Sequence, residues 1–232
     1  MTQEAHGGGA GALVVAHRGA WGEAPENSLA AFEHAIALGC AGIELDVRVT
    51  ADHRLAVVHN ARIAGRPVSR LTLAQLRAAL RPGQAPLLEE VLDMSAGRIM
   101  LDVELKELGG ARHAASVVAR RLDPSGYVIT SFQEAALREA RRGAPHARLG
   151  LLLGPRLRRR ELEARLRRAE AQFVAPHVSL VRRGILDWSG ERGLGSWLWT
   201  VNDARALRRL RADARVEAVI TDRPQRALAA QR

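Results

Sequence analysis

The chain has 232 residues, of which 47% are hydrophobic, and a formal net charge of +10. This length can bury one sizeable core, and a single cysteine, Cys40, excludes an intrachain disulfide and favours a reducing compartment. Lys106 is the only lysine, so the positive charge reflects general use of arginine. With 3% aromatic residues, the chain lacks the stacking side chains typical of a single-strand nucleic-acid binder, and we expect no nucleic-acid partner.

The sequence predicts neither a signal peptide nor a membrane span. Residues 1–11 have no basic segment followed by an apolar one, so we predict a flexible tail and no signal peptide. No apolar run approaches the length that spans a bilayer. The expected location is therefore cytoplasmic.

Short apolar runs alternate with amphipathic helices along the chain. Eight main strands are predicted at residues 13–19, 42–50, 98–106, 127–132, 149–153, 173–175, 196–201 and 218–221. Helices are predicted at residues 28–38, 71–80, 87–94, 112–122, 134–142, 160–169, 185–192, 203–213 and 225–230, with a short extended piece at 55–60. The alternation predicts parallel βαβ units in one catalytic domain over residues 1–232. Eight units can close as a (β/α)₈ barrel, and a doubly wound open sheet is the alternative.

Two local patterns refine the helices. Asn27 is a plausible N-cap for the first helix, and Gly39 is its stop signal. In the arginine-rich segment 155–168, Leu157, Leu162 and Leu166 fall at helical spacing, which predicts one buried stripe and a solvated charged face.

Carboxylates share one face of two predicted strands. Because side chains alternate along a strand, Glu44 and Asp46 lie on one face of strand 42–50, and Asp102, Glu104 and Lys106 on one face of strand 98–106. Buried carboxylates need compensation, which internal ion pairs could supply. Several carboxylates on inward faces favour a divalent cation, and the oxygen ligands suit Mg²⁺ or Ca²⁺.

Histidines and cations lie at the ends of the early strands. His17 and Arg18 end the first strand, and His59 ends the extended piece, so a barrel would gather them at one mouth. Two histidines, two cations and a metal suit a phosphate diester, because one imidazole can accept a proton while the other protonates the leaving alkoxide. Trp199 is expected to share a face with Trp197 and Val201, either in the core or in a pocket wall.

A set of ordered motifs runs along almost the whole chain. It comprises HRG at 17–19, PEN at 25–27, IELDV at 43–47, VVH at 57–59, ELK at 104–106, SF at 131–132, WTVN at 199–202 and ITDRP at 220–224. Together these motifs resemble the glycerophosphodiester phosphodiesterase family. The resemblance implies a (β/α)₈ barrel that hydrolyses small-molecule glycerophosphodiesters to sn-glycerol 3-phosphate and an alcohol.

The resemblance also implies roles for individual residues. Glu44, Asp46 and Glu104 match the ligands of one divalent cation, and His17 and His59 match the acid/base pair. The residues that match substrate-binding positions are Arg18, Lys106 and Trp199. Asn60 stands where the family usually has Asp, and the insertion after the second strand is shortened. The alternatives are a lipid phosphodiesterase of the lysophospholipase D type and a non-catalytic phosphate-binding barrel.

Overall fold

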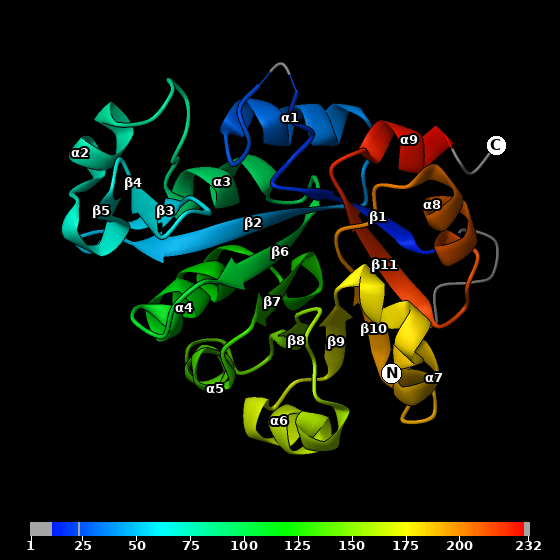
Figure 1. Ribbon diagram of the computed structural model, residues 1–232. Coiled ribbons are helices and arrows are strands. Elements are labelled where there is room, and N and C mark those ends of the chain that lie inside the picture. The colour runs from blue at the N-terminus through cyan, green and yellow to red at the C-terminus, as the bar shows by residue number, and fades with distance from the viewer. Residues whose placement is uncertain (1–10, 23, 230–232) are drawn as a thin grey trace.

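Eight parallel strands form a closed barrel in the computed structural model, which describes residues 11–22 and 24–229 (Figure 1). The strands are β1 (Leu13–His17), β2 (Gly42–Val49), β6 (Met100–Leu105), β7 (Tyr127–Ser131), β8 (Arg148–Leu153), β9 (Phe173–Pro176), β10 (Gly195–Leu198) and β11 (Val216–Thr221). They pair with their neighbours in chain order, and β1 pairs with both β2 and β11. This closure confirms the barrel and excludes the open sheet.

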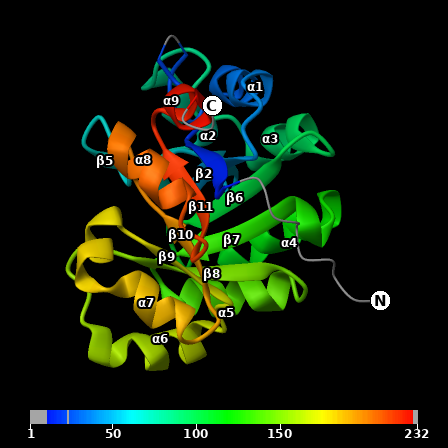
Figure 2. The same ribbon diagram turned by 90° about the vertical axis from the view of Figure 1, so that its right-hand side faces the viewer.

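Helices surround the outside of the barrel (Figure 2). They are α1 (Leu29–Ala37), α3 (Leu88–Ser95), α4 (Ala111–Arg121), α5 (Glu134–Gly143), α6 (Leu162–Ala169), α7 (Ile185–Gly190), α8 (Ala204–Arg211) and α9 (Pro224–Ala229), with short 3₁₀ helices η2 (Pro124–Gly126), η3 (Arg159–Glu161) and η4 (Val178–Arg183). The main core lies between strands and helices, where residues such as Leu45, Val103 and Leu137 are fully buried. In the arginine-rich segment, Leu157, Leu162 and Leu166 are buried, as predicted.

The cap of α1 differs from the prediction. Ser28, not Asn27, is the N-cap, because its Oγ accepts a hydrogen bond from the backbone N–H of Ala31 at 3.2 Å. Asn27 is buried and its side chain is used elsewhere. Gly39 follows the helix at φ +77°, the left-handed conformation that favours glycine and ends the helix.

The segment between β2 and α3 forms a small layer beside the barrel. Strand β3 (Leu55–Val57) pairs antiparallel with β2, and β4 (Arg62–Ile63) and β5 (Arg66–Pro67) form a hairpin, followed by η1 (Val68–Arg70) and α2 (Leu73–Ala78). This segment has an apolar cluster of its own, comprising Ala56, Val58, Ile63, Val68, Leu71, Leu76 and Ala85. An insertion after the second strand is therefore present, and its shortening relative to the family stays a prediction.

Side chains plug the amino end of the barrel. Phe173 and Trp197 pack together with ring centroids 5.2 Å apart, in a second apolar cluster inside the strands. The indole N–H of Trp197 and the Arg148 guanidinium both donate to Glu217 Oε2, at 3.0 and 2.6 Å. Such a packed interior leaves the carboxyl end of the strands as the place for a site.

Two predictions concern the ends of the chain. Almost all of the predicted tail at residues 1–11 lies outside the described residues, and the single domain over 1–232 stays a prediction. Within the described part, no helix is both long and apolar enough to cross a bilayer.

Candidate active site

Three predicted carboxylates meet at the carboxyl ends of β2 and β6. These strands are neighbours, with Glu44 opposite Asp102 and Asp46 opposite Glu104. Glu44, Asp46 and Glu104 are 4%, 1% and 8% exposed, so they have almost no contact with bulk water. Each offers an oxygen atom, and these atoms lie within 4.8 Å of one another. The strand-face analysis thus placed them correctly.

The two predicted cations lie against this cluster. Lys106 Nζ is 3.1 Å from Asp46 Oδ1 and 2.7 Å from Glu104 Oε1. Arg18 Nε lies 3.2 Å from Asp46 Oδ2, and the backbone N–H of Arg18 donates to Glu44 Oε2 at 3.1 Å. Burial opposes ionisation of Asp46, but Lys106 and Arg18 together hold its pKa below the usual value.

The other carboxyl groups feel an excess of negative charge. Burial raises the pKa of Glu44 well above its usual value, and Asp46, Glu104 and Asp102 raise it further. Burial also raises the pKa of Glu104. Asp102 is fully buried, accepts a 2.7 Å hydrogen bond from Thr130, and has its pKa raised by burial to about 7. Four carboxyl groups outnumber two neighbouring cations, and this donor set fits a hard divalent cation.

His17 is oriented by two residues that the sequence analysis placed in the WTVN and ITDRP motifs without assigning them a role. Its Nδ1 lies 2.6 Å from Asp222 Oδ1, and its Nε2 lies 3.8 Å from Glu44 Oε2. Asn202 donates to Asp222 Oδ2 at 2.6 Å and accepts from the backbone N–H of Asp222 at 2.9 Å. The sequence could have indicated a site role for Asp222, because this residue directly follows the last barrel strand.

His59 has a different environment. Its Nδ1 lies 2.9 Å from the side-chain oxygen of Asn60, which is a neutral acceptor. The Arg48 guanidinium donates to the backbone carbonyl of His59 at 2.9 Å and fixes the segment that follows β3. Burial lowers the pKa of His59, although the Asp46 carboxylate opposes this effect.

The PEN motif also has a structural explanation. Glu26 accepts two hydrogen bonds from Arg18 Nη1, at 3.1 and 3.0 Å. The Asn27 amide donates to Asp46 Oδ2 at 2.8 Å. Arg18 and Asn27 both have positive φ, 57° and 51°, which turns the loop after β1 back toward β2. The motif therefore holds the phosphate-binding candidate Arg18 and the metal-ligand candidate Asp46 in place.

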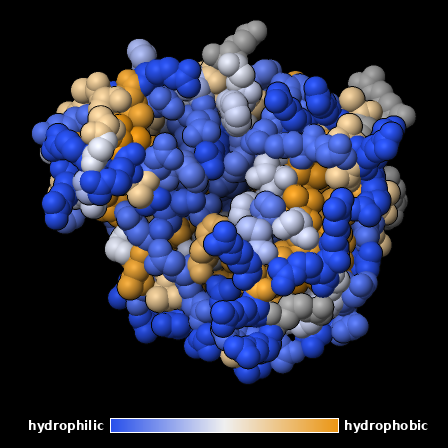
Figure 3. Space-filling view, viewed as in Figure 1, coloured by the Kyte–Doolittle hydropathy of each residue, from blue (hydrophilic) through white to orange (hydrophobic). Residues whose placement is uncertain are grey.

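A pocket of about 270 Å³ opens above these residues, and its walls differ in polarity. His17, Arg18, Glu44, His59, Asp102, Glu104, Lys106 and Thr130 form the polar part, while Phe132, Leu152, Trp199, Thr200 and Ile220 line the rest. Figure 3 shows a hollow near the middle of this face, with hydrophilic residues to its left and hydrophobic ones to its right.

Trp199 belongs to the pocket wall. Its ring meets Phe132 edge-on with centroids 5.5 Å apart, and its indole N–H donates to the Ala175 carbonyl at 2.7 Å. His177 contacts the Trp199 ring, with centroids 5.0 Å apart. The expected common face of Trp199 and Val201 is wrong, because β10 ends at Leu198 and Val201 packs in the outer core.

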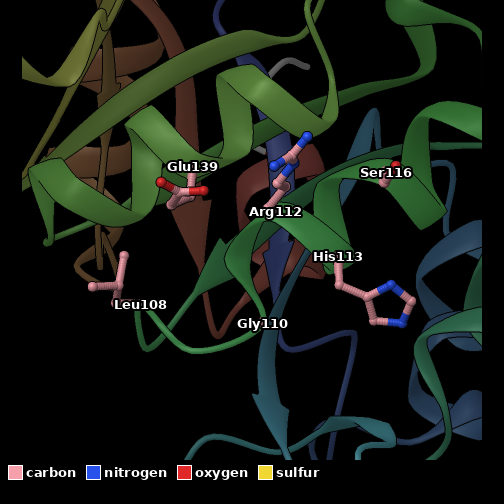
Figure 4. A pocket seen from close by; sticks show the side chains of 6 residues that line it. All are labelled: Leu108, Gly110, Arg112, His113, Ser116 and Glu139. Carbon is pink, nitrogen blue, oxygen red and sulfur yellow. The ribbon is translucent and has the colours of Figure 1, made fainter.

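A second depression lies outside the barrel, between α4, α5 and the loop after β6. It is lined by Leu108, Gly110, Arg112, His113, Ser116 and Glu139 (Figure 4). In this view the His113 and Glu139 side chains point away from each other. The depression does not gather convergent catalytic groups, so the barrel mouth is the better candidate for an active site.

A closed (β/α)₈ barrel with carboxylates, cations and histidines at its mouth fits a phosphoric diester hydrolase. The chain belongs to the glycerophosphoryl diester phosphodiesterase family, whose model matches residues 17–226. It is 28% identical to a glycerophosphodiester phosphodiesterase of Caldanaerobacter subterraneus, over 92% of this chain and 95% of that protein.

Solved structures agree with this assignment. A crystal structure of a glycerophosphodiester phosphodiesterase from Parabacteroides distasonis superposes with a TM-score of 0.81 at 28% identity, covering 97% of this chain and 98% of that one. A phosphodiesterase of Oleispira antarctica, solved with the product sn-glycerol-3-phosphate, shares the fold with a TM-score of 0.79 at 23% identity, covering 95% and 96% of the two chains.

Proposed function

We propose that this enzyme hydrolyses glycerophosphodiesters to sn-glycerol 3-phosphate and an alcohol, with one Mg²⁺ or Ca²⁺ held by Glu44, Asp46 and Glu104. The observation that carries the proposal is the buried carboxylate cluster within 4.8 Å, placed between two cations and facing two histidines. The names of the relatives support the substrate class, and the product complex of the Oleispira antarctica phosphodiesterase supports sn-glycerol 3-phosphate as the product.

Arg18 and Lys106 bind the phosphate in this proposal. Both side chains are largely buried and held by carboxylates, so they are preorganised and lose little freedom when substrate binds. A bound divalent cation would add positive charge beside the non-bridging phosphate oxygens. The aromatic wall of Trp199 and Phe132 packs against the organic part of the diester.

The surroundings of the two histidines suit different proton-transfer roles. Burial lowers the pKa of His59, which favours the neutral ring that a general base needs. Asp222 accepts from Nδ1 of His17 and holds Nε2 toward the pocket, which suits the proton donor to the leaving alkoxide. An alkoxide is a poor leaving group, so we expect loss of His17 to be most harmful for unactivated esters.

A metal-dependent activity screen tests this proposal. Purified protein would be incubated with glycerophosphodiesters of different head groups, with EDTA, Mg²⁺ or Ca²⁺, and sn-glycerol 3-phosphate would be measured. The expected result is product release that requires a divalent cation and that His17→Ala abolishes. Absence of product with every head group and metal, or full activity in His17→Ala, would refute the proposal. Diester binding without turnover would instead favour the phosphate-binding barrel.

A further inference from the structure

Large exposed hydrophobic side chains gather at one end of the barrel. The described residues include four such side chains, Leu13, Trp21, Leu108 and Phe132, which are 42%, 39%, 48% and 40% exposed. Leu13 begins β1 at the amino end, but the other three lie in loops that follow β1, β6 and β7. The term mouth face is used for all loops that follow barrel strands, together with the insertion after β2. The pocket opens in this face, and Phe132 lines it.

Two arginine-rich segments flank the same face, although Arg77 in one pairs with Glu90 and Arg160 in the other lies 3.7 Å from Glu161. Residues 53–88, which include the insertion, contain six arginines and no Asp or Glu, and the loop at 154–160 contains four arginines and no acid. Arg62 and Arg66 contact only backbone carbonyls, and Arg156 and Arg158 are exposed. None of these four forms an ion pair with a carboxylate in the described part of the chain. Their charge is therefore directed to solvent.

Three acids of the mouth face pair with cationic or imidazole side chains, whereas Asp52 and Asp203 are exposed and, among the described residues, accept only from a hydroxyl or a backbone N–H. Glu26 binds Arg18, Glu107 lies 3.6 Å from Arg48, and Asp222 binds His17. Ion pairs also occur at the opposite end of the barrel. There Arg98 pairs with Glu33 at 2.7 Å, and Arg215 with Asp213 at 2.6 Å. Ion pairs thus occur at both ends, and the unpaired charges of Arg62, Arg66, Arg156 and Arg158 lie at the end that carries the pocket.

We propose that the mouth face docks on an anionic lipid surface and presents the pocket to diesters at that surface. Exposed Trp, Phe and Leu side chains can enter the headgroup region, and arginines around them are attracted to anionic lipids. A soluble polyanion would explain the arginines but not the exposed apolar groups. The docking proposal rests on the proposed function, because docking would bring the pocket to its diester substrates. Diesters that resemble lysophospholipids would then be within reach of the pocket.

A pair of labelling variants tests where the protein meets lipid. Cys40 is buried, so Leu108→Cys and the matched control Leu13→Cys can each carry an environment-sensitive fluorophore at one exposed position. With vesicles of phosphatidylglycerol and phosphatidylcholine, the label at position 108 should shift to the blue while the label at position 13 does not. Vesicles of phosphatidylcholine alone should leave both unchanged. Equal shifts at both positions, or none with anionic vesicles, would overturn the proposal.

Charge-reversal variants test the arginines. Arg62→Glu/Arg66→Glu and Arg156→Glu/Arg158→Glu should each weaken sedimentation with anionic vesicles on the order of tenfold or more. Arg120→Glu/Arg167→Glu changes net charge equally at exposed positions near the ends of α4 and α6, and should bind like the wild type. An equal loss of vesicle binding in all three double variants would contradict lipid docking. So would binding to soluble heparin that is tighter than binding to vesicles, if the fluorophore at position 108 also shows no spectral shift.

Turnover without vesicles separates this inference from the proposed function. The mouth-face arginine variants should hydrolyse soluble glycerophosphodiester as the wild type does, because these arginines lie outside the pocket. If wild-type protein binds anionic vesicles but hydrolyses no glycerophosphodiester, the proposed function fails and docking stands. If it hydrolyses the diester but ignores vesicles, only the docking proposal fails.

Discussion

His17 and Asp222 are 205 positions apart in the sequence, yet His17 Nδ1 and Asp222 Oδ1 lie 2.6 Å apart. The contact joins the first and last strands of the barrel, which pair with each other at its seam. It leaves Nε2 of His17 facing Glu44 and the pocket. The carboxylate thus selects both the orientation and the protonated nitrogen of the ring.

Asp222→Asn should lower kcat by about 10- to 100-fold with little change in KM, because the ring loses its anionic partner while the pocket keeps its shape. Steady-state kinetics on glycerophosphocholine would measure this. Asp203→Asn is a suitable control, since Asp203 caps α8 nearby without touching His17. A large rise in KM with unchanged kcat would argue against an orienting role.

Glu44→Gln should abolish the stabilisation of the protein by Mg²⁺ or Ca²⁺. A ligand that binds only the folded state raises its stability, and Glu44 is one of three expected ligands. Without metal, the variant should unfold at the same or a higher temperature than the wild type, because a neutral amide relieves the repulsion from Asp46 and Glu104. Thermal unfolding with EDTA and with each metal would measure both effects, with Asp52→Asn as the control. A metal-induced shift of wild-type size in Glu44→Gln would exclude Glu44 as a ligand.

Lys106→Arg should reduce kcat/KM strongly, on the order of 100-fold, despite preserving charge. The ammonium lies between Asp46 and Glu104 at 3.1 and 2.7 Å, and a planar guanidinium does not fit the same point contact. Arg120→Lys on the outside of α4 is the reciprocal control and should leave kcat/KM unchanged. Near-normal activity in Lys106→Arg would mean that the position requires only a positive charge.

Gly150→Ala should destabilise the barrel by about 1–3 kcal/mol. A Cβ at this position would lie 2.2 Å from Phe173 Cζ, so the ring at the barrel floor would have to move. Gly109→Ala is the matched control, because a Cβ there meets no atom within 4 Å. Urea unfolding would compare the two, and equal stabilities would show that the floor can repack freely.

Cys40 should be unreactive toward thiol reagents in the native protein at neutral pH. Burial raises its pKa from 9.0 to about 11, so the reactive thiolate is suppressed. Because the thiol ionises at lower pH in the unfolded chain, alkaline pH favours unfolding. The contribution of the neutral Cys40 thiol to the free energy of unfolding is therefore fully present below about pH 9 and is lost as the pH rises through about 11. Ellman's reagent with and without urea would measure accessibility. Rapid reaction of the folded protein would show that the thiol is exposed.

Much of the site could be predicted from the alternation of side chains along strands. Glu44, Asp46 and Glu104 converge because their strands are neighbours in the barrel, which the βαβ rhythm anticipated. Asp222 and Asn27 could not be assigned in the same way, because their partners depend on barrel closure and on a loop with positive φ. The metal, the individual roles of the site residues and the cytoplasmic location stay predictions.

The small apolar cluster under the insertion has a consequence for catalysis at rising temperature. Val58, which precedes His59, packs in that cluster, whereas Leu55 and Val57 of β3 pack in the main core. A layer with its own contacts can open locally while the rest of the molecule stays folded. Such an opening would remove one proton-transfer group and leave the carboxylates, Lys106 and His17 in place. Heat inactivation would then precede loss of the barrel, and cooling would restore turnover without refolding.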